Sequence, residues 1–346
     1  MEVSAGAYVG VTHPKFGTTP YLGSGTTRPA GAYHGGGMDP FRLRRAVDRA
    51  VDFLAASQEP HGELAGRLYG DAGLTAPGTP DSSPFVTTFA VYALSFAGPR
   101  AAAAAAKGLG FLLEQREPGG LWRYWSSRNP RRIDPDLDDT CCAAFLVARL
   151  APSLHDASAE AAILANRTKD GLFRTWVRAP EAKNDVDAAV NANVLLYLGA
   201  HEAGQRAALA LNRTMAGGAD LYCHYYVDPL ALDYMVARAF AHGASGLSAS
   251  RPAILHRLTE ADEATASPLQ TALACCTRLN LDAGGAALER GLERLLDVQG
   301  PDGAWPRAAF YCGPEPPTRP RAWWGSEELT TAFALEALAK ALQHRA

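Results

Sequence analysis

Residues 136–150 read DLDDTCCAAFLVARL, an acidic opening that continues into an apolar stretch. Asp136 precedes the first apolar residue, as a helix N-cap does, and Asp138 and Asp139 fall in the first turn. Beyond Thr140 the residues are mostly small or apolar, which is typical of a helix buried on all sides. The stretch therefore predicts an interior helix over 137–151 whose N-terminus carries three carboxyl groups.

Five other segments repeat this order of polar opening and apolar continuation. They are SSPFVTTFAVYAL (82–94), DVDAAVNANVLLYL (185–198), DPLALDYMVARAF (228–240), SPLQTALACCTRL (267–279) and SEELTTAFALEAL (326–338). Between them lie segments with a wide charged face, such as RLRRAVDRAVDFLAA (42–56) and AALERGLERLLDV (286–298). The pattern predicts helices near 40–57, 84–97, 99–116, 137–151, 157–166, 185–201, 204–215, 229–243, 250–260, 267–280, 284–298 and 326–343. Alternation typical of strands is nearly absent.

These helices predict an all-α fold, an (α/α)6 barrel in which apolar inner helices alternate with amphipathic outer helices. The six inner N-termini would then surround one end of a central cavity. A second repeat supports the pairing of helices: QGPDGAWP (299–306) has degenerate copies in QEPHGEL (58–64), QREPGGLW (115–122) and NRTKDGLF (166–173). Each copy places an amide near a helix end and then a glycine turn.

Composition limits the function further. The chain has 346 residues and a formal net charge of -3, so no basic field indicates nucleic acid. No apolar run reaches the length of about 18 to 20 residues that spans a bilayer, and no secretory signal is present, so we expect a cytoplasmic protein. Residues 1–37 are rich in glycine and predict a flexible leader, with Met38 as a candidate start. Residues 38–346 would form a single barrel domain.

Within this pattern, DLDDT at 136–140 resembles the DxDD motif of class II terpene cyclases, the group that includes squalene–hopene cyclases. QGPDGAW resembles the glutamine–tryptophan repeat of that superfamily, and WGSEELTTAFALEAL (324–338) resembles its last inner helix. The resemblance implies a protonation-initiated cyclase, an isomerase acting on a linear prenyl diphosphate such as farnesyl or geranylgeranyl diphosphate. It also implies that Asp138 donates the proton and that Asp136 and Asp139 orient and tune it.

Several further residues are candidates for contacting such a substrate. Arg131 and Arg132 could clamp a diphosphate, and aromatic faces could stabilise a carbocation. The full set of substrate candidates is Trp122, Trp125, Arg131, Arg132, Phe85, Thr88, Tyr92, Asp187, Asn191, His224, Tyr225, Tyr226, Asp233, Trp324 and Glu327. Asp187 and Asn191 lie four residues apart on one helix face, so they could hold Mg²⁺ or orient the head of the substrate. Mg²⁺ would act through the diphosphate.

Other interpretations remain open at this point. The three acids could serve only as a helix cap, and the barrel could be a non-catalytic isoprenoid-binding or scaffold protein. Asp139-Thr140-Cys141 fits half of the zinc motif of protein prenyltransferases, but no histidine precedes His344 in the last helix. Because no CxxC occurs and a zinc site needs its full ligand set, we expect no zinc.

Overall fold

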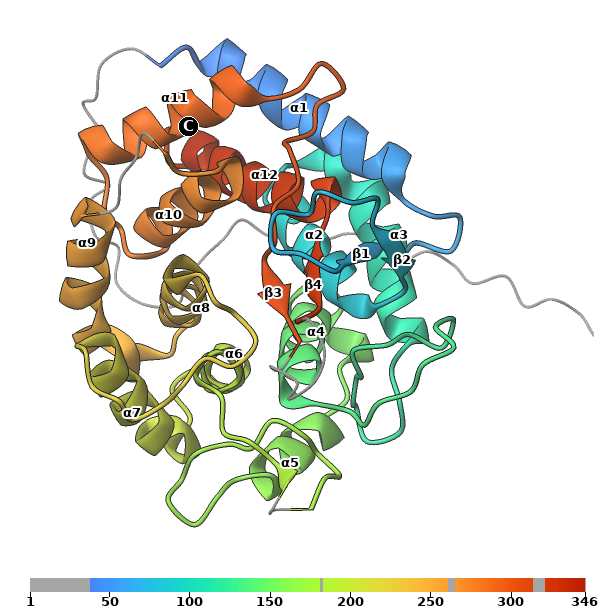
Figure 1. Cartoon of the computed structure of the whole chain (residues 1–346), viewed down its shortest axis with the longest axis vertical. Helices are drawn as coiled ribbons and strands as arrows, with labels where there is room; N and C mark the ends of the chain where they lie inside the picture. Colours follow the sequence, from blue (N-terminus) through green and yellow to red (C-terminus); the bar gives the residue numbers. More distant parts are fainter. Residues whose placement is uncertain (1–37, 181–182, 261–264, 314–320, 346) are drawn as a thin grey trace, which may run out of the picture.

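The computed structural model describes residues 38–180, 183–260, 265–313 and 321–345. The predicted leader, residues 1–37, lies outside the described residues. Within these ranges, α-helices alternate between an inner and an outer ring (Figure 1). The inner helices are α2 (Pro84–Leu94), α4 (Leu137–Leu150), α6 (Ala188–Leu198), α8 (Pro229–Ala241), α10 (Pro268–Asn280) and α12 (Glu327–Gln343). The outer helices are α1 (Pro40–Ser57), α3 (Ala102–Glu114), α5 (Ser158–Ala165), α7 (Gln205–Met215), α9 (Arg251–Glu260) and α11 (Ala286–Val298).

The inner ring is closed. Each inner helix packs against the next one along the chain, and α12 packs against α2. Short 3-10 helices sit in the connections, at Pro99–Ala101, Pro152–Leu154, Glu202–Gly204 and Ser245–Ser250. The predicted (α/α)6 barrel is therefore confirmed, with small differences at helix ends. For example, α6 begins at Ala188 rather than 185, because Asp187 is its N-cap.

Burial explains which helices lie inside. Every residue of α2 is buried, so this helix is covered on all sides. In α1, by contrast, the buried residues form one stripe with helical spacing: Leu43, Ala46, Val47, Ala50, Val51 and Leu54. A single apolar stripe is what a helix needs to cover a core from outside.

All six inner helices begin at the same end of the barrel. Each has a side-chain N-cap, from Ser83, Asp136, Asp187, Asp228, Ser267 and Ser326. Contacts join these openings to one another. For example, the Gln270 amide at the start of α10 donates to Asp228 at the start of α8, at 2.8 Å. The predicted convergence of the inner N-termini is thus confirmed.

The degenerate repeat fastens the loops to the inner helices. In four copies, the backbone N–H of an apolar loop residue donates to a polar side chain on the following inner helix: Leu64 to Thr87, Trp122 to Thr140, Phe173 to Asn191 and Trp305 to Thr331. The amides of Gln58 and Gln299 each donate to two backbone carbonyls. The repeat therefore satisfies backbone groups that the loops would otherwise bury unpaired.

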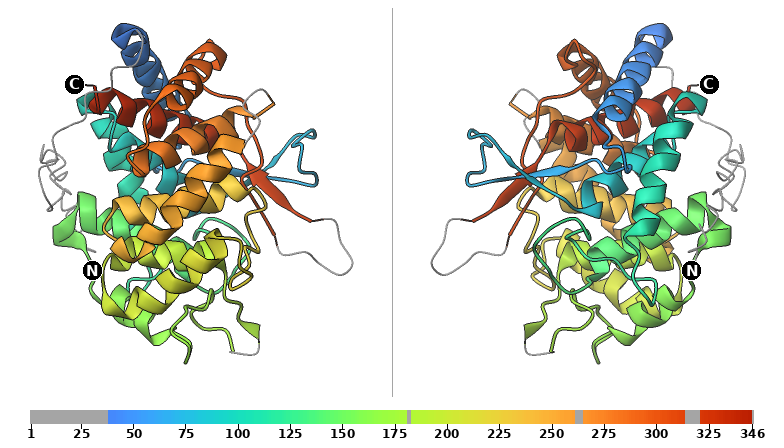
Figure 2. Two further views of the ribbon diagram at one scale, coloured as in Figure 1. Left: turned by 90° about the vertical axis from the view of Figure 1, so that its left-hand side faces the viewer. Right: turned by 90° about the vertical axis from the view of Figure 1, so that its right-hand side faces the viewer.

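A small antiparallel sheet, which the sequence did not predict, lies at the end where the inner helices begin (Figure 2). Its order is β2-β1-β4-β3, with β1 at Gly66–Tyr69, β2 at Thr79–Asp81, β3 at Tyr311–Cys312 and β4 at Trp323–Gly325. Arg67 lies opposite Pro80 on one side and Gly325 on the other. Strands of two to four residues are too short to show an alternating pattern, so they could not be predicted.

None of the helices in the described ranges has the length and apolar character that a membrane span requires.

Candidate active site

The three acids lie where α4 begins, and they have different environments. Asp136 caps the helix: its Oδ1 accepts from the Asp139 backbone N–H at 2.8 Å. Asp136 and Asp139 are both buried, with 3% and 4% of their surface exposed, whereas Asp138 is only half-buried. Asp138 therefore differs from its neighbours in keeping part of its surface uncovered by protein atoms.

Asp138 is held by two neutral hydrogen-bond donors from other inner segments. The Tyr226 hydroxyl, just before α8, donates to Asp138 Oδ2 at 2.6 Å. The Asn193 side-chain amide, on α6, donates to Asp138 Oδ1. Each carboxyl oxygen thus has one donor aimed at it, which fixes the orientation of the group.

Asn193 connects Asp138 to a buried arginine. The Asn193 side-chain carbonyl accepts from Arg238 Nη2 at 2.7 Å. Arg238, on α8, is only 2% exposed, and its guanidinium lies 5.0 Å from the ring centre of Phe89 and 5.2 Å from that of Tyr234. Figure 1 shows α6 and α8, which carry these residues, side by side in the inner ring.

Burial changes the proton affinity of all three acids. Burial, together with the negative charge of Asp138, raises the pKa of Asp136 to about 7. Burial and the charges of Asp136 and Asp138 raise the pKa of Asp139 well above its usual range. Burial also raises the pKa of Asp138, but hydrogen bonds from Tyr226 and Asn193 and the charge of Arg238 act in the opposite direction.

These environments allow a division of labour. The carboxyl groups of Asp136 and Asp139 are hydrogen bonded, with protonated Asp139 as the donor and Asp136 as the acceptor. The pair can therefore retain one proton. Asp138 has donors that stabilise its carboxylate form. It is therefore the member of the cluster best arranged to lose a proton.

Aromatic rings gather in the interior beside Asp138. We call Phe85, Phe89, Tyr226, Tyr234, Phe310 and Phe333 the aromatic cluster. The ring of Tyr226 lies 5.3 Å from that of Phe310, which lies 4.8 Å from that of Phe333. The cluster therefore joins the hydroxyl on Asp138 to rings from α2, α8 and α12. Of the predicted substrate residues, Phe85 and Tyr226 belong to it.

The other predicted residues of α2 have internal partners. Thr88 is buried, and its hydroxyl donates to the Pro84 carbonyl in the same helix at 2.9 Å. The Tyr92 hydroxyl lies 2.7 Å from His242 Nε2 and accepts from Lys340 Nζ at 3.2 Å. These contacts come from the last turns of α8 and α12, so Tyr92 lies toward the end of the barrel opposite the acids.

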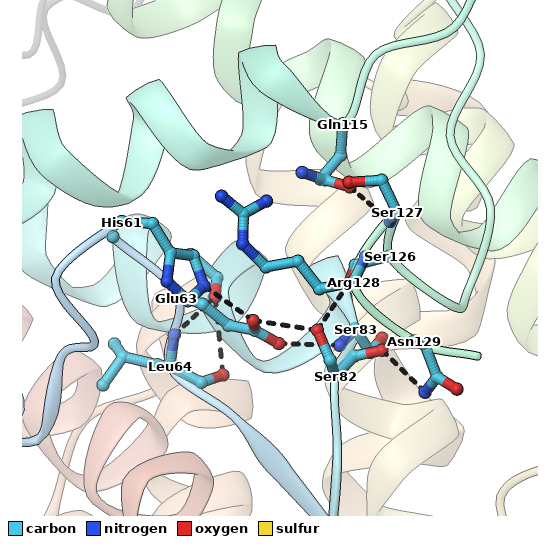
Figure 3. A network of polar contacts seen from close by, with 12 residues as sticks. His61, Glu63, Leu64, Ser82, Ser83, Gln115, Ser126, Ser127, Arg128 and Asn129 are labelled. Atoms are coloured by element: carbon cyan, nitrogen blue, oxygen red, sulfur yellow. Dashed lines mark hydrogen bonds and ion pairs between the residues drawn. The ribbon is translucent and has the colours of Figure 1, made fainter. Parts of the chain in front are cut away.

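The loop at 120–132 has a structural role. Trp122 is buried and donates from Nε1 to the Leu112 carbonyl at 2.7 Å, as Trp305 does to Leu295 at 2.9 Å. Figure 3 shows how this loop is fixed further along: the Ser126 hydroxyl meets that of Ser82 at 2.5 Å, and Ser82 donates to Glu63. Trp122 therefore holds the repeat together, away from the interior.

Asp81, which was not predicted as a site residue, is contacted by three of the predicted substrate-binding residues. This buried carboxylate accepts from Arg131 Nη2 at 2.8 Å and from Trp324 Nε1 at 2.7 Å. Trp125 Nε1 lies 3.4 Å away, and the Arg131 guanidinium stacks over the Trp125 ring. With its charge matched by Asp81, Arg131 is poorly suited to clamp a diphosphate.

Arg132 points elsewhere. Together with Trp125 it lines a surface pocket of about 340 Å³, whose other lining residues include Glu114 and Glu117. None of the three acids lines this pocket, so it is separate from the site at Asp138.

The predicted Mg²⁺ ligands do not fit a metal. Asp187 Oδ1 accepts from the backbone N–H groups of Ala189 and Val190, and its Oδ2 accepts from the backbone N–H of His224 at 2.5 Å. Asn191 Oδ1 accepts from the backbone N–H of Phe173, and Asn191 Nδ2 donates to the carbonyl of the same residue. Burial raises the pKa of Asp187 to about 6. Within the described ranges, no three His, Cys, Asp or Glu side chains are grouped as a metal would require.

The remaining candidates are not brought to Asp138. His224 is exposed. The backbone carbonyl of Tyr225 accepts from the backbone N–H of Cys312. Burial and the charge of Asp185 raise the pKa of the Tyr225 hydroxyl. Asp233 faces outward and pairs with Arg257 of α9 at 2.5 Å. Glu327 pairs with Arg307 at 3.1 Å and is partly exposed. The contacts of Asp233 and Glu327 argue against their predicted role in substrate binding.

Asn193 and Arg238 were missed by sequence reasoning, although both carry a signal. Each is a polar residue inside a mostly apolar inner helix. A polar side chain in such a position must find a partner inside the barrel, but the sequence does not say which partner.

Comparison with known proteins places this geometry in context. No family model matches the chain. It is 27% identical over 317 residues to drimenyl diphosphate synthase from Streptomyces showdoensis, a match that covers 80% of this chain and 54% of that protein. The chain thus spans about half the length of the curated relative it matches.

Two solved structures share the fold. The type II terpene cyclase MstE from Scytonema matches with a TM-score of 0.65 at 19% identity, covering 88% of this chain and 99% of that one. The ent-copalyl diphosphate synthase from Streptomyces platensis matches with a TM-score of 0.51 at 16% identity, covering 88% and 67%. The resemblance to class II terpene cyclases is therefore confirmed in sequence and in fold.

Proposed function

We propose that this chain is a class II, protonation-initiated terpene cyclase that acts on a linear prenyl diphosphate, either farnesyl or geranylgeranyl diphosphate. One observation carries the proposal. Asp138 is half-buried beside aromatic rings and receives hydrogen bonds from Tyr226 and Asn193 that favour its carboxylate form.

The reaction begins with proton transfer from Asp138 to the terminal alkene. The O–H bond of Asp138 breaks, and the alkene π pair forms a C–H bond at the less substituted carbon. The positive charge appears on the more substituted carbon, where the next alkene attacks it and closes a ring. The carboxylate that remains keeps the electron pair of the O–H bond, and the donors from Tyr226 and Asn193 stabilise it.

Asp136 and Asp139 prepare Asp138 for this step. Because they share a hydrogen bond and have raised pKa values, they retain a proton that limits the negative charge beside Asp138. Asp136 also holds the first turn of α4 through its cap. Both residues act on Asp138 and would not themselves touch the substrate.

The aromatic cluster supplies the surroundings for the cation. The faces of aromatic rings attract a positive charge by about 0.5 to 2 kcal/mol each. The four phenylalanine rings of the cluster also carry no heteroatom nucleophile that would trap it. Rings come from α2, α8 and α12, so they would surround a folded chain from several sides.

The relatives guide the choice of substrate. The sequence match is to drimenyl diphosphate synthase, while MstE has been solved with geranylgeranyl dihydroxybenzoate as its substrate. We favour the diphosphate because the match in sequence is to the diphosphate enzyme. Mg²⁺ would be carried by that diphosphate, and we expect no zinc. We place the reaction in the cytoplasm, since all six cysteines are free thiols.

Incubation of the purified protein with geranyl, farnesyl and geranylgeranyl diphosphate, with and without Mg²⁺, tests the proposal. We expect cyclised, still phosphorylated products from farnesyl or geranylgeranyl diphosphate after mass analysis. The Asp138→Asn variant, which keeps the size of the side chain without its acidic proton, should give none. The proposal is wrong if neither longer substrate is cyclised, or if Asp138→Asn cyclises at the parent rate.

A further inference from the structure

Arg238 is a buried cation without a matching anion. Two other buried charges in the barrel have a partner of opposite sign: Lys340 has Glu336 at 2.6 Å, and Asp233 has Arg257. Among the described residues, no carboxylate lies within ion-pair distance of Arg238, and its Nε has no hydrogen-bond partner. Its Nη2 donates to the Asn193 carbonyl at 2.7 Å and meets Cys142 Sγ at 3.3 Å.

An unpaired guanidinium is expensive to bury, because it loses its hydration without gaining a counter-ion. The rings of Phe89, Tyr92 and Tyr234 lie 5.0 to 5.5 Å from it and recover part of this cost. Aromatic faces do not replace an anion. The arrangement is understandable if the anion appears only during the reaction.

Asn193 points from Arg238 to the place where that anion would form. A guanidinium can only donate hydrogen bonds, so the oxygen of the Asn193 side chain must face Arg238. The amide nitrogen then faces Asp138 and donates to its Oδ1. The dipole of Asn193 is therefore aligned with its positive end toward the carboxyl group.

We propose that Arg238 is a positioning residue whose counter-ion is created by catalysis: the Asp138 carboxylate, linked to it through Asn193. This inference rests on the proposed function. Before proton transfer, Asp138 is neutral and Arg238 is unpaired. Once the O–H bond of Asp138 has broken and the proton has bonded to the alkene carbon, the two residues carry opposite charges across one side chain.

An interaction that exists only after the proton leaves stabilises the transition state more than the bound substrate. Arg238 would therefore raise the rate of the chemical step with little effect on substrate binding. Because the guanidinium cannot lose its own proton under ordinary conditions, the charge remains available throughout the reaction.

Other titratable groups face these two residues, and they set the background against which Arg238 acts. Those near Asp138 are Asp136, Asp139, Cys141 and Cys142 of α4, Asp187 at the start of α6, Cys223 and Tyr226 before α8, and Tyr311 of β3. Those near Arg238 are Cys142, Tyr92, Tyr234, Glu336 and His242. Within the described ranges, Arg238 is the one cation that lowers the pKa of Asp138.

The experiment compares Arg238→Gln, which removes the charge, with Arg238→Lys, which keeps it. Product formation at saturating substrate is measured across pH, and KM is measured separately. In Arg238→Gln we expect kcat to fall about 10²- to 10³-fold with KM nearly unchanged. The basic limb of the kcat profile should move up by about one pH unit or more, because Asp138 becomes a weaker acid. Arg238→Lys should keep the limb close to its original position.

Arg278 offers a matched control. It is another buried arginine, but its Nη2 donates to the Leu258 carbonyl at 3.0 Å on an outer helix. Arg278→Gln should lower the melting temperature without moving the basic limb. If Arg238→Gln does not fold, as judged by circular dichroism, Arg238→Met takes its place.

The result that overturns the inference is a charge-free Arg238 variant that cyclises with an unmoved basic limb. If the wild-type protein cyclises none of the prenyl diphosphates, the proposed function fails, but the inference can still be read directly. The infrared carbonyl band of protonated Asp138 is obtained by subtracting the spectrum of the matching Asp138→Asn protein. This band is titrated with pH in the wild-type protein and in Arg238→Gln. Loss of the Arg238 charge should move its midpoint to higher pH, and an identical midpoint would reject the link.

Discussion

Tyr226 Oη lies 2.6 Å from Asp138 Oδ2, although the two residues are 88 positions apart in the chain. The segment before α8 therefore reaches the first turn of α4 and places a hydroxyl on the carboxyl group. The same tyrosine ring belongs to the aromatic cluster, 5.3 Å from Phe310. One residue thus links the acid to the rings that would surround the cation.

Tyr226→Phe tests the hydroxyl while keeping the ring. A hydrogen bond to a charged group contributes about 1.5 to 3 kcal/mol, so we expect kcat to fall about 10- to 100-fold with little change in melting temperature. Steady-state kinetics and thermal unfolding of the same sample measure both. Tyr234→Phe is the control, because its hydroxyl donates to Glu336 instead. Equal losses of rate in the two variants would contradict a specific role for Tyr226.

The acids at α4 should separate activity from stability. Asp138→Asn removes the proton donor but not the helix cap, and loss of a general acid commonly costs about 10² to 10⁴ in rate. Asp136→Ala removes the cap and should destabilise the fold by about 1 kcal/mol. Product formation and urea unfolding on both variants decide the matter. A silent Asp138→Asn with a destabilised Asp136→Ala would leave the cluster as a cap only.

Much of this architecture could be predicted from the sequence, because a buried helix is apolar on all sides and a surface helix keeps one charged face. The apolar run after Thr140 can only be an inner helix, and the charged face of 42–56 can only be an outer one. The acids at 136–139 could also be recognised, because a cluster of carboxyl groups at the N-terminus of a buried helix is energetically costly.

The partners of Asp138 could not be predicted, because they depend on contacts across the ring. Asn191 and Asn193 look alike in the sequence, yet Asn191 binds the loop at Phe173 and Asn193 binds Asp138. Only the rotation of α6 separates their roles. Arg131 shows the reverse error: it looked free to bind a diphosphate, but Asp81, on a strand too short to predict, already holds it.

The raised pKa of Asp136 has a consequence for stability. The folded protein binds more protons than the unfolded chain between pH 3.8, the ordinary pKa, and about 7. The stabilisation is therefore full at low pH and is lost as pH rises toward 7, with a slope of at most about 1.4 kcal/mol per pH unit. Urea unfolding at pH 5, 6, 7 and 8 should show this fall in the wild-type protein. Asp136→Asn, which keeps a capping side chain, should make the fall shallower, with the remainder coming from Asp139 and Asp187, whose pKa values are also raised. An unchanged slope would contradict the assignment.

Metal should matter only through the substrate. Both oxygens of Asp187 are already occupied by backbone donors, so this helix end offers no ligand for Mg²⁺. We expect chelation by EDTA to slow the cyclisation of farnesyl diphosphate and to leave that of an uncharged farnesyl ester unchanged. Elemental analysis of the purified protein should find no zinc. Stoichiometric zinc would instead favour a prenyltransferase-like site.

Closure of the outer ring should depend on one glycine. Gly303 has φ +96°, and a Cβ there would lie 2.3 Å from the Arg49 carbonyl of α1. Gly303→Ala must therefore accept both a strained backbone and a clash where the last repeat meets the first helix. Gly98 has a similar φ of +81°, with ψ −166° and nothing near its missing Cβ, so Gly98→Ala carries the backbone strain alone, about 1 to 3 kcal/mol. We expect Gly303→Ala to lose clearly more unfolding free energy than Gly98→Ala, with kcat per folded molecule unchanged in both. If the two variants unfold at the same urea concentration, the contact between Gly303 and α1 does not contribute to closing the ring.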